Sequence, residues 1–112
     1  MKETMEIFVE NYDESTALVM QQLVDLLKQE NVQIAEVNSK EDSESKSIFV
    51  TSIVVPLVVG LTSTFIYDAI KLAYSRLAKH IHEKKTINVR MTNQDGSVSL
   101  AAVEIGNDKK QC

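Results

Sequence analysis

The stretch that decides the fold runs from Ile48 to Lys85 and reads IFVTSIVVPLVVGLTSTFIYDAIKLAYSRLAKHIHEKK. Its first part carries no acidic, basic or histidine side chain before Asp68, and its second part carries charges at helical spacing. Burial of apolar surface is the dominant favourable term in folding, so the uncharged part has to leave water. The rest of the chain is expected to form a small α/β shell around it.

Two interpretations of the uncharged part, residues 48–67, remain open. A helix needs about 20 apolar residues to cross a bilayer. Acidic residues precede the segment and basic residues follow it, which would place the C-terminal side of a spanning helix in the cytoplasm. The other interpretation buries the segment against protein, in a core or a subunit interface. Interruptions by polar residues, Pro and Gly favour burial against protein.

Small residues recur every four positions in this segment, at Ser52, Pro56, Gly60 and Thr64. On one helix they would form a ridge that another backbone could approach closely. The β-branched run Ile48–Val55 fits a buried strand as well as a helix, and Pro56 suits a first helical position. A helix is therefore expected from about Pro56, and the conformation of 48–55 stays open.

From Phe65 onward the pattern predicts an amphipathic helix that reaches Lys85. Its apolar stripe follows steps of three and four residues, at Phe65, Ile66, Ala69, Ile70, Ala73, Leu77 and Ile81. Basic residues occupy its last turns, where they complement the negative end of the helix dipole.

The N-terminal third predicts a β-α-β unit. Met5–Glu10 alternates as a strand, Asp13 suits a helix N-cap, and the following helix extends to about Glu30, with Asn31 as a left-handed stop. Val32–Val37 then predicts a second strand, parallel to the first. Residues 38–46 are polar and charged, and are expected to form a mobile loop.

A β-hairpin is predicted at the C-terminal end. Ile87, Val89 and Met91 alternate with polar residues, and the turn 93–96 ends in Asp-Gly, which supplies positive φ. Val98 and Leu100 have the opposite parity to Val103 and Ile105. Either a bulge at Ala101–Ala102 flips the register, or the second half of the strand is buried on both faces.

Together these elements predict an α+β fold, a two-layer sandwich made of a β-α-β unit, a long helix and the C-terminal hairpin. At 112 residues the chain is expected to be one domain, with residues 106–112 as a polar tail. Its single cysteine, Cys112, excludes a disulfide within the chain, and no signal peptide is recognised, so a cytoplasmic location is expected.

No catalytic, cofactor-binding or metal-binding signature is found. The formal net charge of −4 disfavours nucleic-acid binding. His80 and His82 would lie on different sides of a helix and could not share a metal ion. Gly60 stands alone, without a glycine-rich phosphate loop, and no Gly-x-Ser-x-Gly elbow is present. An enzyme is not expected.

A combination of features resembles a known family. It consists of the N-terminal β-α-β, the uncharged Ile48–Thr64, the helix Phe65–Lys85 and the hairpin INVRMTNQDGSVSL within Thr86–Leu100. This resembles the effector-associated constant component family of bacteria. The resemblance implies a regulatory subunit beside an effector, without catalysis of its own, in a conflict or defence system. In that family the helix usually carries a Trp before a run of Arg. Tyr74 and Arg76 are the positions carried over here.

The leading hypothesis from the sequence is thus a non-catalytic adaptor that binds an effector protein, or itself, through the central apolar segment. The named interaction residues are Ser52, Pro56, Gly60, Thr64, Tyr74 and Arg76. One alternative is a single-pass protein of the inner membrane with its span at 48–67. Another is a small inhibitor, phage-borne or antitoxin-like.

Overall fold

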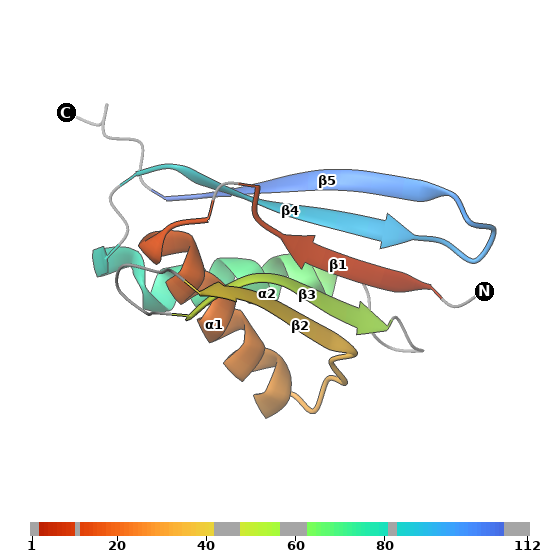
Figure 1. Ribbon diagram of the computed structural model, residues 1–112, viewed down its shortest axis with the longest axis horizontal. Coiled ribbons are helices and arrows are strands. Elements are labelled where there is room, and N and C mark those ends of the chain that lie inside the picture. The colour runs from red at the N-terminus through yellow and green to blue at the C-terminus, as the bar shows by residue number, and fades with distance from the viewer. Residues whose placement is uncertain (1–2, 11, 42–47, 57–62, 81–82, 107–112) are drawn as a thin grey trace.

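A computed structural model of the protein describes residues 3–10, 12–41, 48–56, 63–80 and 83–106. Strands and helices follow in the order β1 (Thr4–Phe8), α1 (Glu14–Gln29), β2 (Glu36–Glu41), β3 (Ile48–Pro56), α2 (Ser63–Arg76), β4 (Lys85–Thr92) and β5 (Val98–Ile105), with a 3-10 turn at Ala78–His80. The strands form one sheet in the order β2-β3-β1-β4-β5. Both helices lie against the same face of it (Figure 1), which confirms the predicted α+β two-layer sandwich.

Helix α1 begins and ends where its local chemistry predicts. The Asp13 carboxylate accepts a hydrogen bond from the Thr16 N–H at 2.9 Å, and the Thr16 hydroxyl accepts one from the Asp13 N–H at 2.8 Å. This reciprocal pair is a capping box, which satisfies donors that a helix start leaves open. Past the other end, Asn31 adopts a φ of 60°, the left-handed conformation that Asn tolerates.

The β-α-β unit is split, with another strand inserted in it. β1 and β2 run parallel, but β3 lies between them and pairs antiparallel with both. The predicted strand at Val32–Val37 is wrong in position, because β2 spans Glu36–Glu41 and takes residues assigned to the loop 38–46. Val32 and Ile34 instead pack at the edge of the core on the way to β2. β2 is an exposed edge strand, so its sequence lacks the alternation that marks a half-buried strand.

The described part of the uncharged segment packs in the protein core through Val50, Ile53, Val55 and Ile66, whereas Ile48 is exposed. Residues 48–56 form strand β3, between β1 and β2, where a β-branched run is buried in the sheet. The spanning helix over 48–67 is therefore wrong in its first half, and no described helix is long and apolar enough to cross a membrane. Helix α2 covers Ser63–Arg76, shorter than the predicted helix, and residues 57–62 lie outside the described ranges.

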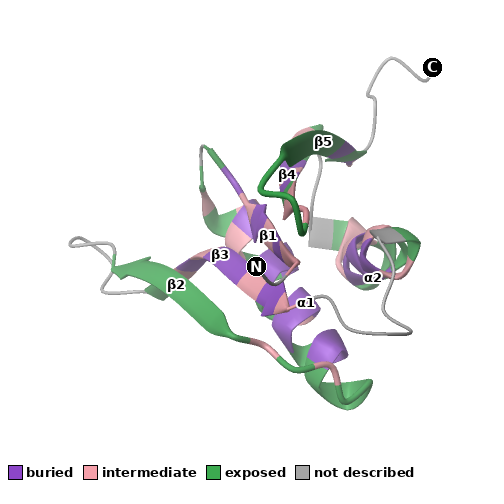
Figure 2. Cartoon of the chain, turned by 90° about the vertical axis from the view of Figure 1, so that its right-hand side faces the viewer, coloured by how far each residue is buried: buried purple, intermediate pink, exposed green. Residues whose placement is uncertain are grey.

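The core lies between the sheet and the two helices. Its fully buried side chains come from both helices and from β1, β3 and β4, and Figure 2 shows their alternation along β1 and β3. The largest of them are Met5, Ile7, Met20, Leu23, Leu27, Ile53, Ile66, Ile70 and Ile87. No buried polar side-chain atom among the described residues lacks a hydrogen-bond partner.

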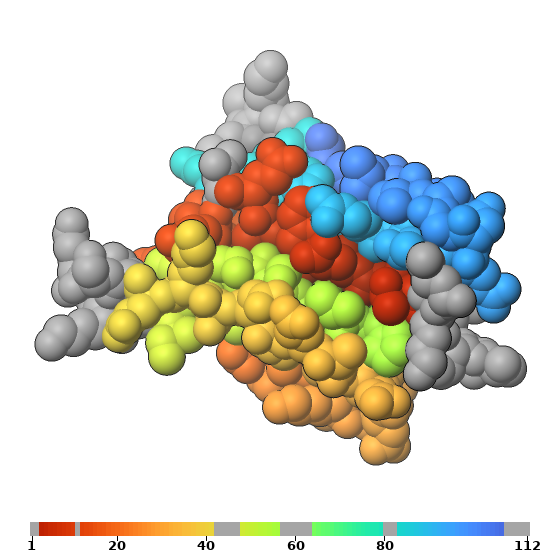
Figure 3. All heavy atoms as spheres, turned by 45° about the vertical axis from the view of Figure 1, so that its right-hand side comes forward, coloured from red at the N-terminus to blue at the C-terminus, as the bar shows by residue number. Residues whose placement is uncertain are grey.

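The hairpin corrects one prediction. The register between β4 and β5 is unbroken from Lys85↔Ile105 to Thr92↔Val98, so there is no bulge at Ala101–Ala102. Nor is the second half of β5 buried on both faces. Val103 and Ile105 are buried on the helix side, and Val98 and Leu100 are exposed on the other face, hereafter the open face. Figure 3 shows this face, which neither α1 nor α2 covers.

Candidate functional site

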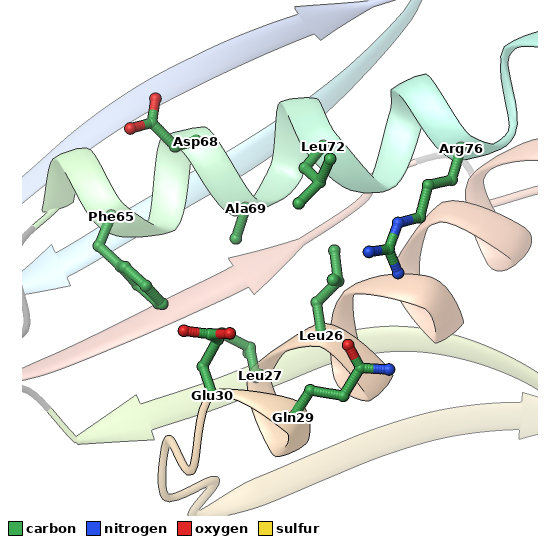
Figure 4. Close-up of a pocket in the computed structure, with 9 residues that line it drawn as sticks. All are labelled: Leu26, Leu27, Gln29, Glu30, Phe65, Asp68, Ala69, Leu72 and Arg76. Atoms are coloured by element: carbon green, nitrogen blue, oxygen red, sulfur yellow. The ribbon is translucent and has the colours of Figure 1, made fainter.

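A groove of about 310 Å³ runs between α1 and α2 on the outer side of the helix layer (Figure 4). Residues of α2 spaced by three and four positions form one wall, because that spacing brings side chains to one face of a helix. The C-terminal end of α1 forms the other wall. The lining residues are Leu26, Leu27, Gln29, Glu30, Phe65, Asp68, Ala69, Leu72 and Arg76. The volume lies at the lower end of the range for small-molecule sites.

The floor of the groove is apolar. Leu26 and Ala69 are almost fully buried, and the small Ala69 side chain leaves space between the helices. Leu72 adds an exposed apolar wall, with 46% of its surface accessible. The Leu72 side chain is not part of the buried core, so much of its apolar surface stays in water. It provides a contact area for a ligand with an apolar body.

Charges stand at the two ends of the groove. In Figure 4 the Arg76 side chain extends from α2 toward α1 at one end, and Glu30 lies at the other end, with Phe65. Asp68 is on the rim and points away from α1. Arg76 forms no ion pair or hydrogen bond with a described residue, so its guanidinium is available to an anion. The groove is therefore apolar in the middle, cationic at one end and anionic at the other.

A second, polar hollow of about 420 Å³ lies at the start of α1, lined by Glu10, Asp13, Thr16, Lys84, Lys85, Thr86 and Asn88. Both lysines that line it form ion pairs within the chain. Lys85 Nζ donates to the carboxylates of Asp13 and, at 3.4 Å, of Glu83, and Lys84 forms an ion pair with Glu104 at 3.4 Å. This arrangement holds the end of the sheet to α1.

The ionisation of that pair follows from its contacts. Partial burial of the Asp13 carboxyl raises its pKa, but the hydrogen bonds that it accepts from Lys85 and from the Thr16 N–H outweigh burial, so the pKa of Asp13 is lowered. The hydrogen bond to Asp13 raises the pKa of Lys85. Both groups are thus held in their charged forms, which suits a structural ion pair better than an acid or a base in catalysis.

The residues named from the sequence are spread over the fold. Ser52 and Pro56 are in strand β3, Thr64 is exposed in the first turn of α2, and Gly60 lies outside the described residues, so these positions do not form one helical ridge. Ser52 is buried and accepts a hydrogen bond from Asn38 Nδ2 at 2.8 Å. Tyr74 packs against the core. Of the named residues that the structure describes, Arg76 alone lines the groove.

Sequence reasoning missed the other groove residues. Leu72 stands off the predicted stripe, and an isolated leucine among Asp68, Lys71 and Ser75 was the available signal. The part of the chain that the structure describes holds no group of three or more His, Cys, Asp or Glu side chains that could bind a metal ion. The prediction that His80 and His82 lie on different sides of a helix is not tested, because His82 falls outside those ranges.

No protein-family model matches the chain, and no curated protein matches it. Among solved structures the chain is similar to a phage SAM lyase in complex with S-methyl-5'-thioadenosine, with 14% identity and a TM-score of 0.44 over 95% of this chain and 90% of that chain. That protein is an enzyme. This finding contradicts the predicted function, a non-catalytic adaptor with its alternatives, and the prediction that the chain has no enzymatic activity. At this TM-score the likeness transfers neither activity nor ligand to this chain.

Proposed function

We propose that the protein binds a small, elongated molecule with an apolar body and one anionic group in the groove between α1 and α2. The observation that carries this proposal is the Arg76 guanidinium, which extends beside an apolar floor and has no described ion-pair partner. Guanidinium groups bind carboxylates and phosphates through paired hydrogen bonds. The anionic group of the ligand would lie at Arg76.

The apolar body would lie along Leu26, Ala69 and Leu72 and end near Phe65. Each buried methylene contributes about 0.8 kcal/mol, so chain length should strengthen binding until the groove is filled. Glu30 at the far end repels a second negative charge. The groove therefore selects a monoanion over a dianion.

The test is a titration of the ¹⁵N-labelled protein with octanoate, followed by amide chemical shifts. About ten non-hydrogen atoms at about 0.3 kcal/mol each correspond to a dissociation constant of millimolar order, which this measurement resolves. The largest shifts are expected at Leu26, Phe65 and Leu72. Octanol and octylammonium should bind about tenfold more weakly, because neither forms a charge-assisted contact with Arg76.

Matched variants distinguish the contribution of the Arg76 charge to binding from the contribution of the apolar floor. Arg76→Gln should reduce octanoate binding to the level of octanol and leave octanol binding unchanged, whereas Lys71→Gln, an exposed cation of α2 outside the groove, should change neither. Leu72→Asn should weaken both ligands. Leu18→Asn, on α1 with a similar exposure of 45%, should weaken neither. Octanoate binding that survives Arg76→Gln unchanged would refute the proposal.

A further inference from the structure

Strand β5 is an edge strand of the sheet. It pairs with β4 on one side, and no described strand pairs with its other side. Its first five residues, Val98–Ala102, are exposed, with 55% of Val98 and 69% of Leu100 accessible. An edge strand presents outward-facing N–H and C=O groups that can extend a sheet across to another chain.

The exposed part of this edge carries no charge. Val98–Val103 contains only Val, Ser, Leu and Ala, and Glu104 is paired in the same chain with Lys84. The cross-strand neighbour of Leu100 is Arg90, which is also engaged within the chain. Its guanidinium lies 5.0 Å from the centre of the Phe8 ring and forms an ion pair with Glu6 at 3.0 Å. Arg90 and Glu104 are therefore each paired within the chain, while the Asp95 carboxylate, in the turn before β5, accepts hydrogen bonds from Ser97.

We propose that two copies of the chain associate by antiparallel pairing of their β5 strands about a two-fold axis at Leu100. In this register Leu100 faces Leu100 of the second copy, Val98 faces Ala102, and Ser99 faces Ala101. Val98, Leu100 and Ala102 share the open face and Ser99 and Ala101 share the helix face, so every pair joins residues of the same face. The two sheets become continuous, with all helices on one side.

The uncharged run Val98–Val103 allows two chains of the same net charge to approach each other at this edge. With a formal net charge of −4, two copies repel each other. In the proposed register Glu104 falls opposite Gly96 of the second copy, beyond the paired residues, and no like charges stand opposite each other. The pairing is also self-complementary, as a two-fold interface requires.

Five paired residues bury less surface than a standard interface, so the association should be weak, with a dissociation constant of micromolar order or higher. Sedimentation equilibrium from 10 μM to 1 mM is the direct measurement, with a monomer–dimer equilibrium as the expected result. Leu100→Lys should weaken the association at least tenfold, because two ammonium groups would meet at the axis. The matched control Leu18→Lys makes the same substitution at an exposed leucine of α1, and it should leave the association unchanged.

Cross-linking tests the register in a Cys112→Ser background. Leu100→Cys should form a disulfide-linked dimer on mild oxidation, since directly opposite residues of paired strands lie within disulfide reach. Ala102→Cys should not, because the two copies of residue 102 are about 14 Å apart along the ladder. A wild-type chain that stays monomeric at 1 mM, or equal cross-linking at positions 100 and 102, would overturn the proposal. This test is independent of the groove and of its ligand.

Discussion

The two edges of the sheet are built differently. β2 carries Glu36, Lys40 and Glu41, and its pairing with β3 shifts register between Asn38 and Ser39. β5 runs in unbroken register and is uncharged over Val98–Val103. Charged residues and register irregularities protect an edge from pairing with other chains. The comparison teaches that one edge of this sheet is protected against association and the other is left able to pair.

The largest effect should come from removing the protection of β2. We expect a variant with Glu36→Thr, Lys40→Thr and Glu41→Thr to form open-ended assemblies, since each copy would then offer two pairing edges. Sedimentation velocity would show species beyond the dimer. Adding Leu100→Lys should return the variant to small species, and large assemblies that persist in that combination would show aggregation unrelated to the edges.

Strand β5 has a buried end, which should stabilise the monomer, and an exposed part, which should not. Ile105 is 4% exposed, so Ile105→Ala should lower the free energy of unfolding by about 3 kcal/mol through lost burial and a cavity. Leu100→Ala, five residues earlier on the same strand, should change it by less than about 0.5 kcal/mol in dilute monomer. Urea denaturation of both variants measures the difference, and similar losses would show that the exposed run supports the monomer fold.

A smaller effect is expected at the β2 edge, from the hydrogen bond between Asn38 Nδ2 and Ser52 Oγ at 2.8 Å. Asn38→Ala leaves the buried Ser52 hydroxyl without this donor and should cost about 1 kcal/mol of stability. Ser39→Ala, at the exposed neighbouring position, is the control and should be neutral. An unchanged denaturation midpoint for Asn38→Ala would mean that β2 is held by its main-chain pairing alone.

The smallest effect concerns the ion pair between Asp13 and Lys85, at the start of β4 next to the end of β5. Because the pKa of Asp13 is lowered in the folded state, its contribution is present above the unfolded pKa and is lost as pH falls through the folded pKa. Asp13→Asn keeps a good N-cap but removes the charge.

The variant should lose about 0.5 kcal/mol at pH 7, as expected for a partly exposed pair, and the difference from wild type should vanish toward pH 2. Chemical denaturation at pH 7, 4 and 2 tests this pattern. A difference between the two proteins that is constant across this range would show that the amide weakens the cap and that the charge contributes nothing.

Local chemistry is what the sequence predicted well. The cap at Asp13, the stop at Asn31 and the turn before Ser97 depend on residues within a few positions of one another, and each is found as expected. The two-layer arrangement also followed, because the apolar periodicities of strands and helices determine which faces are buried.

Pairing between distant segments was not predictable in the same way. The insertion of β3 between β1 and β2 depends on contacts across the sheet, and the polar sequence of β2 gave no strand signal. The groove joins Leu26 with Leu72, which the sequence separates by a loop and two strands. Arg76 was named through a family resemblance that stays a prediction, and only its position in the fold brings it next to an apolar floor.

The central place of β1 has a consequence for synthesis of the chain. This strand is synthesised before both of its neighbours in the sheet, Ile48–Pro56 and Lys85–Thr92. The pairing of β1 with β4 therefore cannot form until Lys85–Thr92 has been made, and contacts between residues far apart in sequence slow folding. Until then one edge of β1 has no partner strand.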